Sequence, residues 1–231
     1  MKDAKIFKTT IGGREHKIYS MELAGRTLSL EFGRYAEQAN GSCFVRCGDT
    51  VVMVNVTMSE TPRPGMDFFP LSVDYEEKMY AMGKIPGGFK KREGRASDKA
   101  ILTSRLIDRP LRPLFPKGLP EDVQVLASVI SSDQENESDV LSITAASAAV
   151  MLSPLPFAEA VAGGRIGRIN GQFILNPTVK EMAESDLNIV FAASADALGE
   201  TGKGTANYFI VIGIIETVAL FTLVFSLLLL Q

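Results

Sequence analysis

The stretch SCFVRCGDTVVMVNVTMS, residues 42–59, decides the fold class of this chain. It is rich in Val and Thr and alternates apolar with polar side chains at a period of two, as a half-buried β-strand does. The same alternation occurs in HKIYSMEL (16–23), RTLSLEFGRYA (26–36) and FPLSVDYEEKMYA (69–81). Gly, Asn, Pro or Asp closes each segment, which favours hairpins and meanders. The first half of the chain is therefore predicted to form a sheet.

Helical signals begin at Ser97. Ser97 or Asp98 is placed to cap the N-terminus of a helix, and Pro110 is expected to end it. Three apolar residues mark the predicted buried stripe of this helix: Ile101, Leu102 and Leu106.

Five further elements are predicted after this helix: a strand, a helix of small residues, a hairpin, a short helix and a strand. In chain order they are DVQVLASVIS (122–131), DVLSITAASAAVMLS (139–153), AVAGGRIGRINGQFILNP (160–177), TVKEMAES (178–185) and LNIVFAAS (187–194). The hairpin turn is expected at Asn170-Gly171. Strands followed by alternating helices and strands predict one α+β domain over residues 1–197, with helices packed on a mixed sheet.

The composition is that of a globular protein with a sizeable core, with 46% apolar and 22% charged residues in a chain of 231. Cys43 and Cys47 are not joined by a Cys or His cluster, so we expect reduced thiols in a cytosolic fold and no metal site. His16 lies among charged residues and is interpreted as a surface residue rather than a catalytic one. The N-terminal sequence MKDAKIFKTTIGG lacks the apolar core of a secretory signal, so residues 1–197 are expected in the cytoplasm.

The net charge of −3 conceals a segregation of charge along the chain. From Lys84 to Lys117 there are ten basic and three acidic residues, so this segment carries +7 and the rest of the chain carries −10. Such asymmetry indicates a local anion-binding surface on an acidic body, although a solvated basic face would produce the same pattern.

The segment 82–119, MGKIPGGFKKREGRASDKAILTSRLIDRPLRPLFPKGL, carries this charge. Gly87 and Gly88 permit an exposed, flexible loop, and Phe89 stands next to three cations. A base can stack on such a ring while the cations hold phosphates, which is how proteins grip a single strand without reading its sequence. The three cations are Lys90, Lys91 and Arg92.

Arginines continue along the predicted helix. Arg105 and Arg109 are four residues apart, so both guanidinium groups are expected on one face, with Arg112 just past the proline. Planar guanidinium forks suit phosphate oxygens. The residues alone leave two interpretations open: contact with RNA or DNA, or a solvated loop with structural arginines.

The same segment carries a resemblance to a known family, together with GRYAEQANGSCFVRCGDTVVMVNV (33–56) and FFPLSVDYEEKMYAMGKIPGGF (68–89). From about Lys5 to Ala197 the chain resembles the first core domain of bacterial polynucleotide phosphorylase (polyribonucleotide nucleotidyltransferase), in the RNase PH superfamily. The string RLIDRPLRPLFP (105–116) is long and unusual, which makes the resemblance specific.

The resemblance implies 3′-to-5′ phosphorolytic degradation of RNA with inorganic phosphate and Mg²⁺, in mRNA turnover. It also implies a homotrimer, or assembly with other polynucleotide phosphorylase subunits, around a channel that single-stranded RNA enters. By motif match the RNA-gripping loop is Phe89 with its three cations; the family often has a second Phe and two arginines here, so the charge is kept and one ring is absent. Three further residues match superfamily arginines that line the RNA path: Arg95, Arg105 and Arg109.

The resemblance also implies which part of the family's machinery this chain lacks. The family's active second core binds phosphate through a Ser-rich stretch, where this chain has ENESDVLSITAAS (135–147), with Glu137 and Asp139 in place of anion-binding residues. Two carboxylates repel a phosphate in a poorly solvated site. We therefore expect RNA binding without catalysis by this chain alone, and no ligands for phosphate or Mg²⁺ in it.

The C-terminal residues 198–230 differ in composition from the preceding domain. A Gly-rich joint, 198–207, leads to residues 208–230, which contain one charge, Glu216, and would form a helix of about 35 Å, long enough to cross a bilayer. An acid at this depth is expected to be functional, paired or protonated. The segment resembles the last helix of the proteolipid in the rotor ring of V-type ATPases, in which a mid-membrane Glu carries the ion.

The chain is thus predicted to be an RNase PH-like domain followed by one transmembrane helix. Two alternatives stay open: a proteolipid-like membrane subunit, and an artificial joining of two unrelated fragments at Ala197-Leu198. Two short Gly-rich motifs, GETGKGTAN (199–207) and AGGRIGRING (162–171), are not interpreted as phosphate loops, because the first lacks P-loop spacing and the second is the predicted hairpin.

Overall fold

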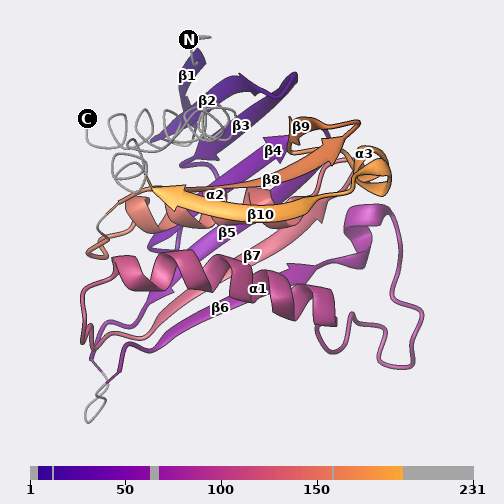
Figure 1. Cartoon of the computed structure of the whole chain (residues 1–231). Coiled ribbons are helices and arrows are strands. Elements are labelled where there is room, and N and C mark those ends of the chain that lie inside the picture. The colour runs from indigo at the N-terminus through magenta and orange to yellow at the C-terminus, as the bar shows by residue number, and fades with distance from the viewer. Residues whose placement is uncertain (1–4, 12, 63–67, 158, 195–231) are drawn as a thin grey trace.

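The computed structural model describes residues 5–11, 13–62, 68–157 and 159–194 (Figure 1). Seven strands form a large sheet in the order β1-β2-β3-β4-β5-β7-β6, and only β6 and β7 run parallel within it. The sheet is therefore mixed, as predicted. Its strands are β1 (Lys5–Ile11), β2 (Arg14–Leu23), β3 (Arg26–Phe32), β4 (Gly41–Cys47), β5 (Thr50–Met58), β6 (Leu71–Glu77) and β7 (Val123–Ser131).

A second, antiparallel sheet has the order β10-β8-β9, with β8 (Val161–Ile169), β9 (Gln172–Leu175) and β10 (Asn188–Ser194). The hairpin β8–β9 turns at Asn170-Gly171, as predicted, and both residues have positive φ, 51° and 79°. That backbone matches the two-residue turn whose twist suits a hairpin. The sequence indicated these strands but not their separation into a sheet of their own.

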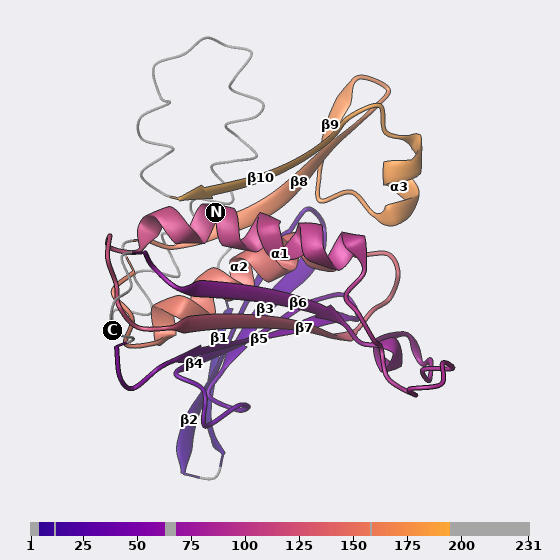
Figure 2. The same cartoon turned by 90° about the horizontal axis from the view of Figure 1, so that it is seen from below.

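Three α-helices complete the described part: α1 (Asp98–Leu111), α2 (Ser138–Leu152) and α3 (Val179–Glu184), with 3₁₀ turns η1 (Met79–Met82) and η2 (Arg112–Leu114). Helix α2 lies between the two sheets, and α1 lies beside it over the β6 end of the large sheet (Figure 2). Thr178 and Glu181 form the capping box that starts α3.

Helix α2 is buried on all sides from Asp139 to Val150. Glycines in both sheets allow this close approach. A Cβ on Gly41 of β4 would lie 2.1 Å from the Ala149 carbonyl oxygen, and one on Gly163 of β8 would lie 2.7 Å from the Ile143 Cβ. The run of Ala and Ser in α2 and these glycines together place three layers in close contact.

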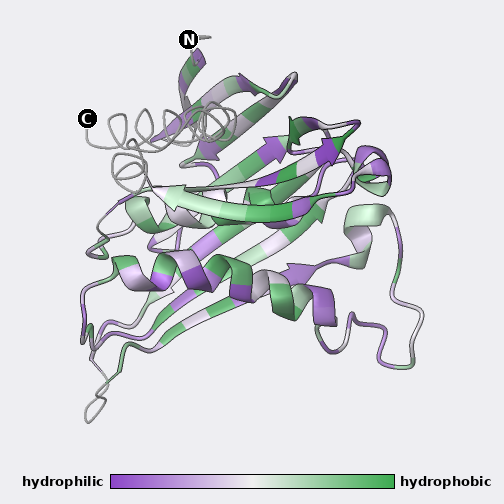
Figure 3. Ribbon diagram, in the orientation of Figure 1, coloured by the Kyte–Doolittle hydropathy of each residue, from purple (hydrophilic) through white to green (hydrophobic). Residues whose placement is uncertain are grey.

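Green, hydrophobic residues fill the strands that face α2, and they also cover most of β10 (Figure 3). The core includes Val45, Val54, Val125 and Ile143, each at most 1% exposed. Cys43 is fully buried and Cys47 partly buried; both are free thiols, as expected. Burial raises the pKa of each thiol, which keeps it protonated and unreactive.

The surface interpretation of His16 is wrong. Its side chain is 3% exposed, and its Nε2 lies 2.8 Å from Glu31 Oε1 on the neighbouring strand. The error arises because His16 has charged neighbours in sequence, whereas strand alternation turns its own side chain inward.

Among the residues that the structure describes, no helix is both long enough and apolar enough to cross a bilayer. The predicted transmembrane helix 208–230, its Glu216 and the joint 198–207 lie outside the described residues.

Candidate functional site

The predicted RNA-binding loop lies between η1 and α1 and extends away from both sheets (Figures 1 and 2). At its tip the Lys91 amide donates to the Gly88 carbonyl over 2.9 Å, which closes a turn with Phe89 and Lys90 at its centre. The Phe89 ring is fully exposed, at 105% of its reference area. A phenyl ring held in water at the tip of a turn can stack on a base without first leaving a packed core.

Four cations follow Phe89 in this loop: Lys90, Lys91, Arg92 and Arg95. All four side chains are exposed, and in the described part of the chain none of them forms an ion pair. Their charge is therefore not neutralised by a described carboxylate, and it is available to phosphate groups.

Helix α1, which follows the loop, carries two further exposed arginines. Ser97 caps it by accepting a hydrogen bond of 3.1 Å from the Ala100 amide, as predicted. Arg105 and Arg109 are both exposed, one turn apart, on the side of the helix opposite its buried residues. The loop and this face of α1 together form what we call the basic strip: residues 89–95, Arg105 and Arg109.

The predicted apolar stripe of α1 is wrong. Leu102 is 65% exposed, and Ile101 and Leu106 are each more than a third exposed. The buried face consists instead of Ala100, Thr103, Ile107 and Leu111. Those positions also follow helical spacing, but Ala and Thr give a weak apolar signal, so the larger residues determined the prediction.

Pro110 does not end α1, which continues to Leu111 before η2. The Arg112 amide still bonds to the Asp108 carbonyl, so one helical hydrogen bond forms beyond the proline. Proline removes its own N–H and crowds the preceding turn, but it leaves the residues after it free to stay helical.

Arg112 has a structural role. Its guanidinium donates to both Asp108 carboxylate oxygens, over 3.1 and 2.6 Å, and to the Leu71 carbonyl over 3.0 Å. These bonds tie the end of α1 to β6. Arg112 therefore does not belong to the basic strip, although it belongs to the basic run in the sequence.

The stretch 135–147, singled out in the sequence for Glu137 and Asp139, begins just before α2 and forms its first turns. Asp139 is buried, its carboxylate accepts from the Val140 amide over 2.7 Å, and Arg165 of β8 donates to it over 2.5 Å. Glu137 is paired with Lys99 over 3.3 Å. A carboxylate thus already neutralises the buried guanidinium at this helix end.

The loop before α2 is held by Asp133. Its carboxylate accepts from the Glu135 and Asn136 amides, each over 2.8 Å, and from the Thr50 hydroxyl, also over 2.8 Å. Burial opposes ionisation of this carboxyl, but the hydrogen bonds outweigh burial and hold its pKa well below the usual value.

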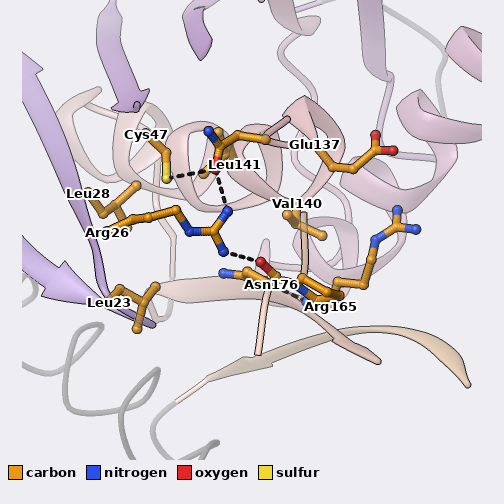
Figure 4. Close-up of a pocket in the computed structure, with 11 residues that line it drawn as sticks. Leu23, Arg26, Leu28, Cys47, Glu137, Val140, Leu141, Arg165 and Asn176 are labelled. Atoms are coloured by element: carbon orange, nitrogen blue, oxygen red, sulfur yellow. Dashed lines mark hydrogen bonds between the residues drawn. The ribbon is translucent and has the colours of Figure 1, made fainter. Parts of the chain in front are cut away.

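A cavity of about 20 Å³ lies between this loop, β3 and β8 (Figure 4). Arg26 reaches into it and donates to the Asn136 side chain over 2.5 Å and to the Asn176 carbonyl. Such a volume holds about one water molecule. Inorganic phosphate does not fit, because there is too little room. Both arginines that line the cavity are also engaged, Arg26 with Asn136 and Asn176 and Arg165 with Asp139. Within the described residues no three His, Cys, Asp or Glu side chains converge to hold a metal ion such as Mg²⁺.

Sequence reasoning missed several residues here. Asp133, Asn136 and Arg26 were not singled out, although the Asp and Asn in SDQEN (132–136) are typical of a hydrogen-bonded turn. Arg165, one of two cations in a strand whose other residues are apolar or glycine, was the available signal for a buried ion pair.

Comparisons with known proteins agree with this fold. Residues 24–156 match the family model of the 3′ exoribonuclease (RNase PH) family, domain 1, and residues 159–205 match domain 2 of that family. The chain therefore belongs to the 3′ exoribonuclease (RNase PH) family.

Its curated relatives include polyribonucleotide nucleotidyltransferases. That of Desulfovibrio desulfuricans is 63% identical over 178 residues, which are 77% of this chain and 24% of the relative. That of Lawsonia intracellularis is 62% identical over 187 residues, or 80% of this chain and 25% of the relative. The chain thus spans about a quarter of the length of these relatives.

Solved structures share the fold at low sequence identity. A chain of the Archaeoglobus fulgidus exosome with RNA bound to the active site has a TM-score of 0.57 at 19% identity, over 84% of this chain and 85% of that one. Rice (Oryza sativa) Rrp46 has a TM-score of 0.60 at 16% identity, over 87% of this chain and 94% of that one.

Residues 188–229 match the family model of the ATP synthase C-type subunit, which agrees with the resemblance of the tail to a rotor-ring proteolipid. This match overlaps the domain 2 match over residues 188–205. Within the overlap, 188–194 form β10, which pairs with β8 along its whole length. The described part of the overlap is therefore a strand of the RNase PH fold.

Proposed function

We propose that residues 1–197 bind single-stranded RNA through the basic strip, as the non-catalytic first core of a polynucleotide phosphorylase-type enzyme. The observation that carries this proposal is the fully exposed Phe89 at the tip of a turn, next to cations that no described carboxylate pairs with. A soluble fold normally gains by burying such a ring, so its exposure on a charged loop favours a binding role.

The basic strip is suited to bind single-stranded RNA without recognising its sequence. Arg95 and Arg109 are separated by α1 residues that rise about 1.5 Å each, so cations extend roughly 20 Å from the loop along the helix. Stacking on Phe89 is tolerant of sequence, and backbone contacts from the cations add affinity that depends on salt.

The proposal includes the absence of phosphorolysis by this chain alone. Its support lies at the N-terminus of α2. There Asp139 forms an ion pair with Arg165, and the cavity beside Arg26 holds about one water molecule. Inorganic phosphate and Mg²⁺ would act in the parts of the longer relatives that this chain does not span. A ring assembly, either a homotrimer or one with such longer subunits, would bring the two parts together.

RNA binding is tested by fluorescence anisotropy with a labelled single-stranded RNA and purified chain. Replacing Phe89, Lys90, Lys91 and Arg92 by Ala together is expected to weaken binding at least tenfold, since a stacked base alone contributes about 1–3 kcal/mol. The matched control replaces three exposed cations away from the strip, Lys5, Lys8 and Arg14, by Ala. Equal affinity of the loop variant and the control would reject the loop as the RNA site.

Phosphorolysis is tested by incubating the purified chain with poly(A), phosphate and Mg²⁺. We expect no release of ADP above the level without protein. Sustained ADP release, dependent on phosphate, would contradict the non-catalytic assignment.

A second candidate function, a proteolipid-like membrane protein that carries an ion on Glu216, is favoured by the match of residues 188–229 to the ATP synthase family model. It predicts that a hydrophobic carbodiimide labels Glu216 in membranes and that a Glu216→Gln variant is not labelled. Sequencing genomic DNA with long reads across codons 197–205 distinguishes a continuous gene from two joined fragments.

A further inference from the structure

A groove of about 290 Å³ lies beside the loop and shares Glu93, Gly94 and Arg95 with the basic strip. One wall is the end of β6 and the first residue of η1, Tyr75 to Met79, and the other is the stretch 93–97 with Ala100 of α1. In the second wall Gly94 has no side chain, and Ala96 and Ala100 each have only a methyl group. This volume is near the lower end for ligand pockets, about 300 Å³, which suits one nucleoside rather than a stacked pair.

The charges in the groove differ from those on the loop beside it. Three carboxylates and two cations line it: Glu76, Glu77, Glu93, Lys78 and Arg95. One cation is already neutralised, because Lys78 Nζ lies 2.6 Å from Glu76 Oε2, and this hydrogen bond raises the pKa of Lys78. The groove is therefore acidic while its rim is basic.

Glu93 is the groove carboxylate that is nearest in sequence to Phe89 and its cations. It lies in the loop itself, between Arg92 and Arg95, and its side chain is exposed. In the described part of the chain neither Glu93 nor Glu77 forms a hydrogen bond or ion pair, whereas Glu76 is held by Lys78, whose charge also attracts Glu93. An unpaired carboxylate is a strong acceptor for hydroxyl and N–H groups and repels phosphate.

We infer that the groove takes the ribose and base of one nucleotide of the bound strand, with Glu93 accepting a hydrogen bond from the ribose 2′-hydroxyl. The flanking phosphates stay outside, on the cations of the rim. The 2′-hydroxyl is what allows a protein to distinguish RNA from DNA, so Glu93 becomes a specificity-determining residue that favours RNA. This inference rests on the proposed RNA binding by the strip.

The test compares the affinities of the full chain for a single-stranded RNA and for the DNA of the same sequence, with U replaced by T, by anisotropy at one salt concentration. A hydrogen bond to a charged acceptor changes an equilibrium constant by roughly tenfold or more, so wild type is expected to prefer RNA by about that factor. Glu93→Ala removes the acceptor and a negative charge. Its affinity for both strands is expected to rise, while the RNA preference falls to about twofold or less.

Glu60→Ala is the matched control. Glu60 is an exposed carboxylate two residues after β5. The last residue of β5 lies at the end of the large sheet where β6 begins, whereas the loop follows the other end of β6. The Glu60→Ala substitution removes one negative charge, as Glu93→Ala does, and is expected to leave the preference for RNA over DNA unchanged. The ratio of the two affinities isolates the hydroxyl contact, because the general effect of charge acts equally on RNA and DNA.

The outcomes separate this inference from the proposed function. If wild type binds RNA and DNA equally, or if Glu93→Ala keeps the wild-type preference, the groove assignment is overturned, while strand binding by the loop stands. If wild type binds neither strand, both the proposed function and the groove assignment are overturned.

Discussion

Replacing Asp139 by Asn should destabilise the chain strongly, because it breaks an ion pair at the contact between α2 and β8. The Asp139 side chain is 6% exposed and that of Arg165 is 12% exposed, with 2.5 Å between Oδ2 and the guanidinium. Asn keeps the shape and can still accept from the Val140 amide, so the change removes the charge and little else. The Arg165 Nε already has no hydrogen-bond partner in the described structure, so few groups can compensate.

Removing one partner of a buried pair costs about 3–5 kcal/mol, since it leaves an uncompensated charge in a poorly solvated site. With a urea slope of about 3 kcal/mol per M, the unfolding midpoint should fall by about 1–1.7 M. The assay is urea unfolding of the full chain, followed by circular dichroism at neutral pH. Asp139→Asn combined with Arg165→Met should recover part of the loss, because no unpaired charge then stays buried.

The matched control is the exposed pair Arg168–Asp186, which has the same two residue types and two contacts of 2.9 Å. Both side chains are well exposed, so Asp186→Asn is expected to leave the urea midpoint unchanged within error. If Asp139→Asn and Asp186→Asn shift the midpoint equally, the argument that Asp139 is a buried, structural counter-ion is refuted.

Three further predictions concern the same layers. Gly163→Ala should destabilise by about 1–3 kcal/mol in urea unfolding, because the new Cβ would lie 2.7 Å from that of Ile143; an unchanged midpoint would contradict the close approach. Asp133→Asn should lower the free energy of unfolding at pH 5–7. The difference from wild type should narrow progressively as pH falls below about 3.8, because the unfolded carboxyl is then protonated while the folded one, with its lowered pKa, is still ionised; a difference as wide at pH 2.5 as at pH 6 would contradict this. Tyr75→Phe should lower the free energy of unfolding by about 0.5–1.5 kcal/mol, because it removes the 2.7 Å hydrogen bond between Tyr75 and Ser138. Adding Ser138→Ala to this variant should lower it little further, and additive losses in the double variant would contradict the pairing.

Local patterns in the sequence predicted much of the candidate site. The glycines before Phe89 and the neighbouring cations indicated an exposed loop, and the structure places each of them in solvent. The four-residue spacing of Arg105 and Arg109 likewise predicted a shared, exposed helix face. These features depend on residues close together in the chain, which is why composition and spacing alone indicate them.

Local patterns failed where a side chain meets a distant one. Arg112 looked like its basic neighbours, but its bonds to Asp108 and to the Leu71 carbonyl, 41 residues earlier, remove it from the strip. The apolar stripe of α1 was assigned to the larger residues, although Leu102 faces water and Thr103 is buried. Which face of a helix is buried depends on the sheet beneath it, and helical spacing leaves several faces available.

The sequence by itself determined the three α-helices, the strands after β1, the turn at Asn170-Gly171 and the basic loop, because each follows from periodicity or turn chemistry over a few residues. Only the tertiary structure decided that the strands divide into two sheets with α2 between them, and that Asp139 pairs with Arg165 across 26 residues. Such contacts form when hydrophobic burial brings distant segments together, and a buried charge then takes the partner that the packing provides.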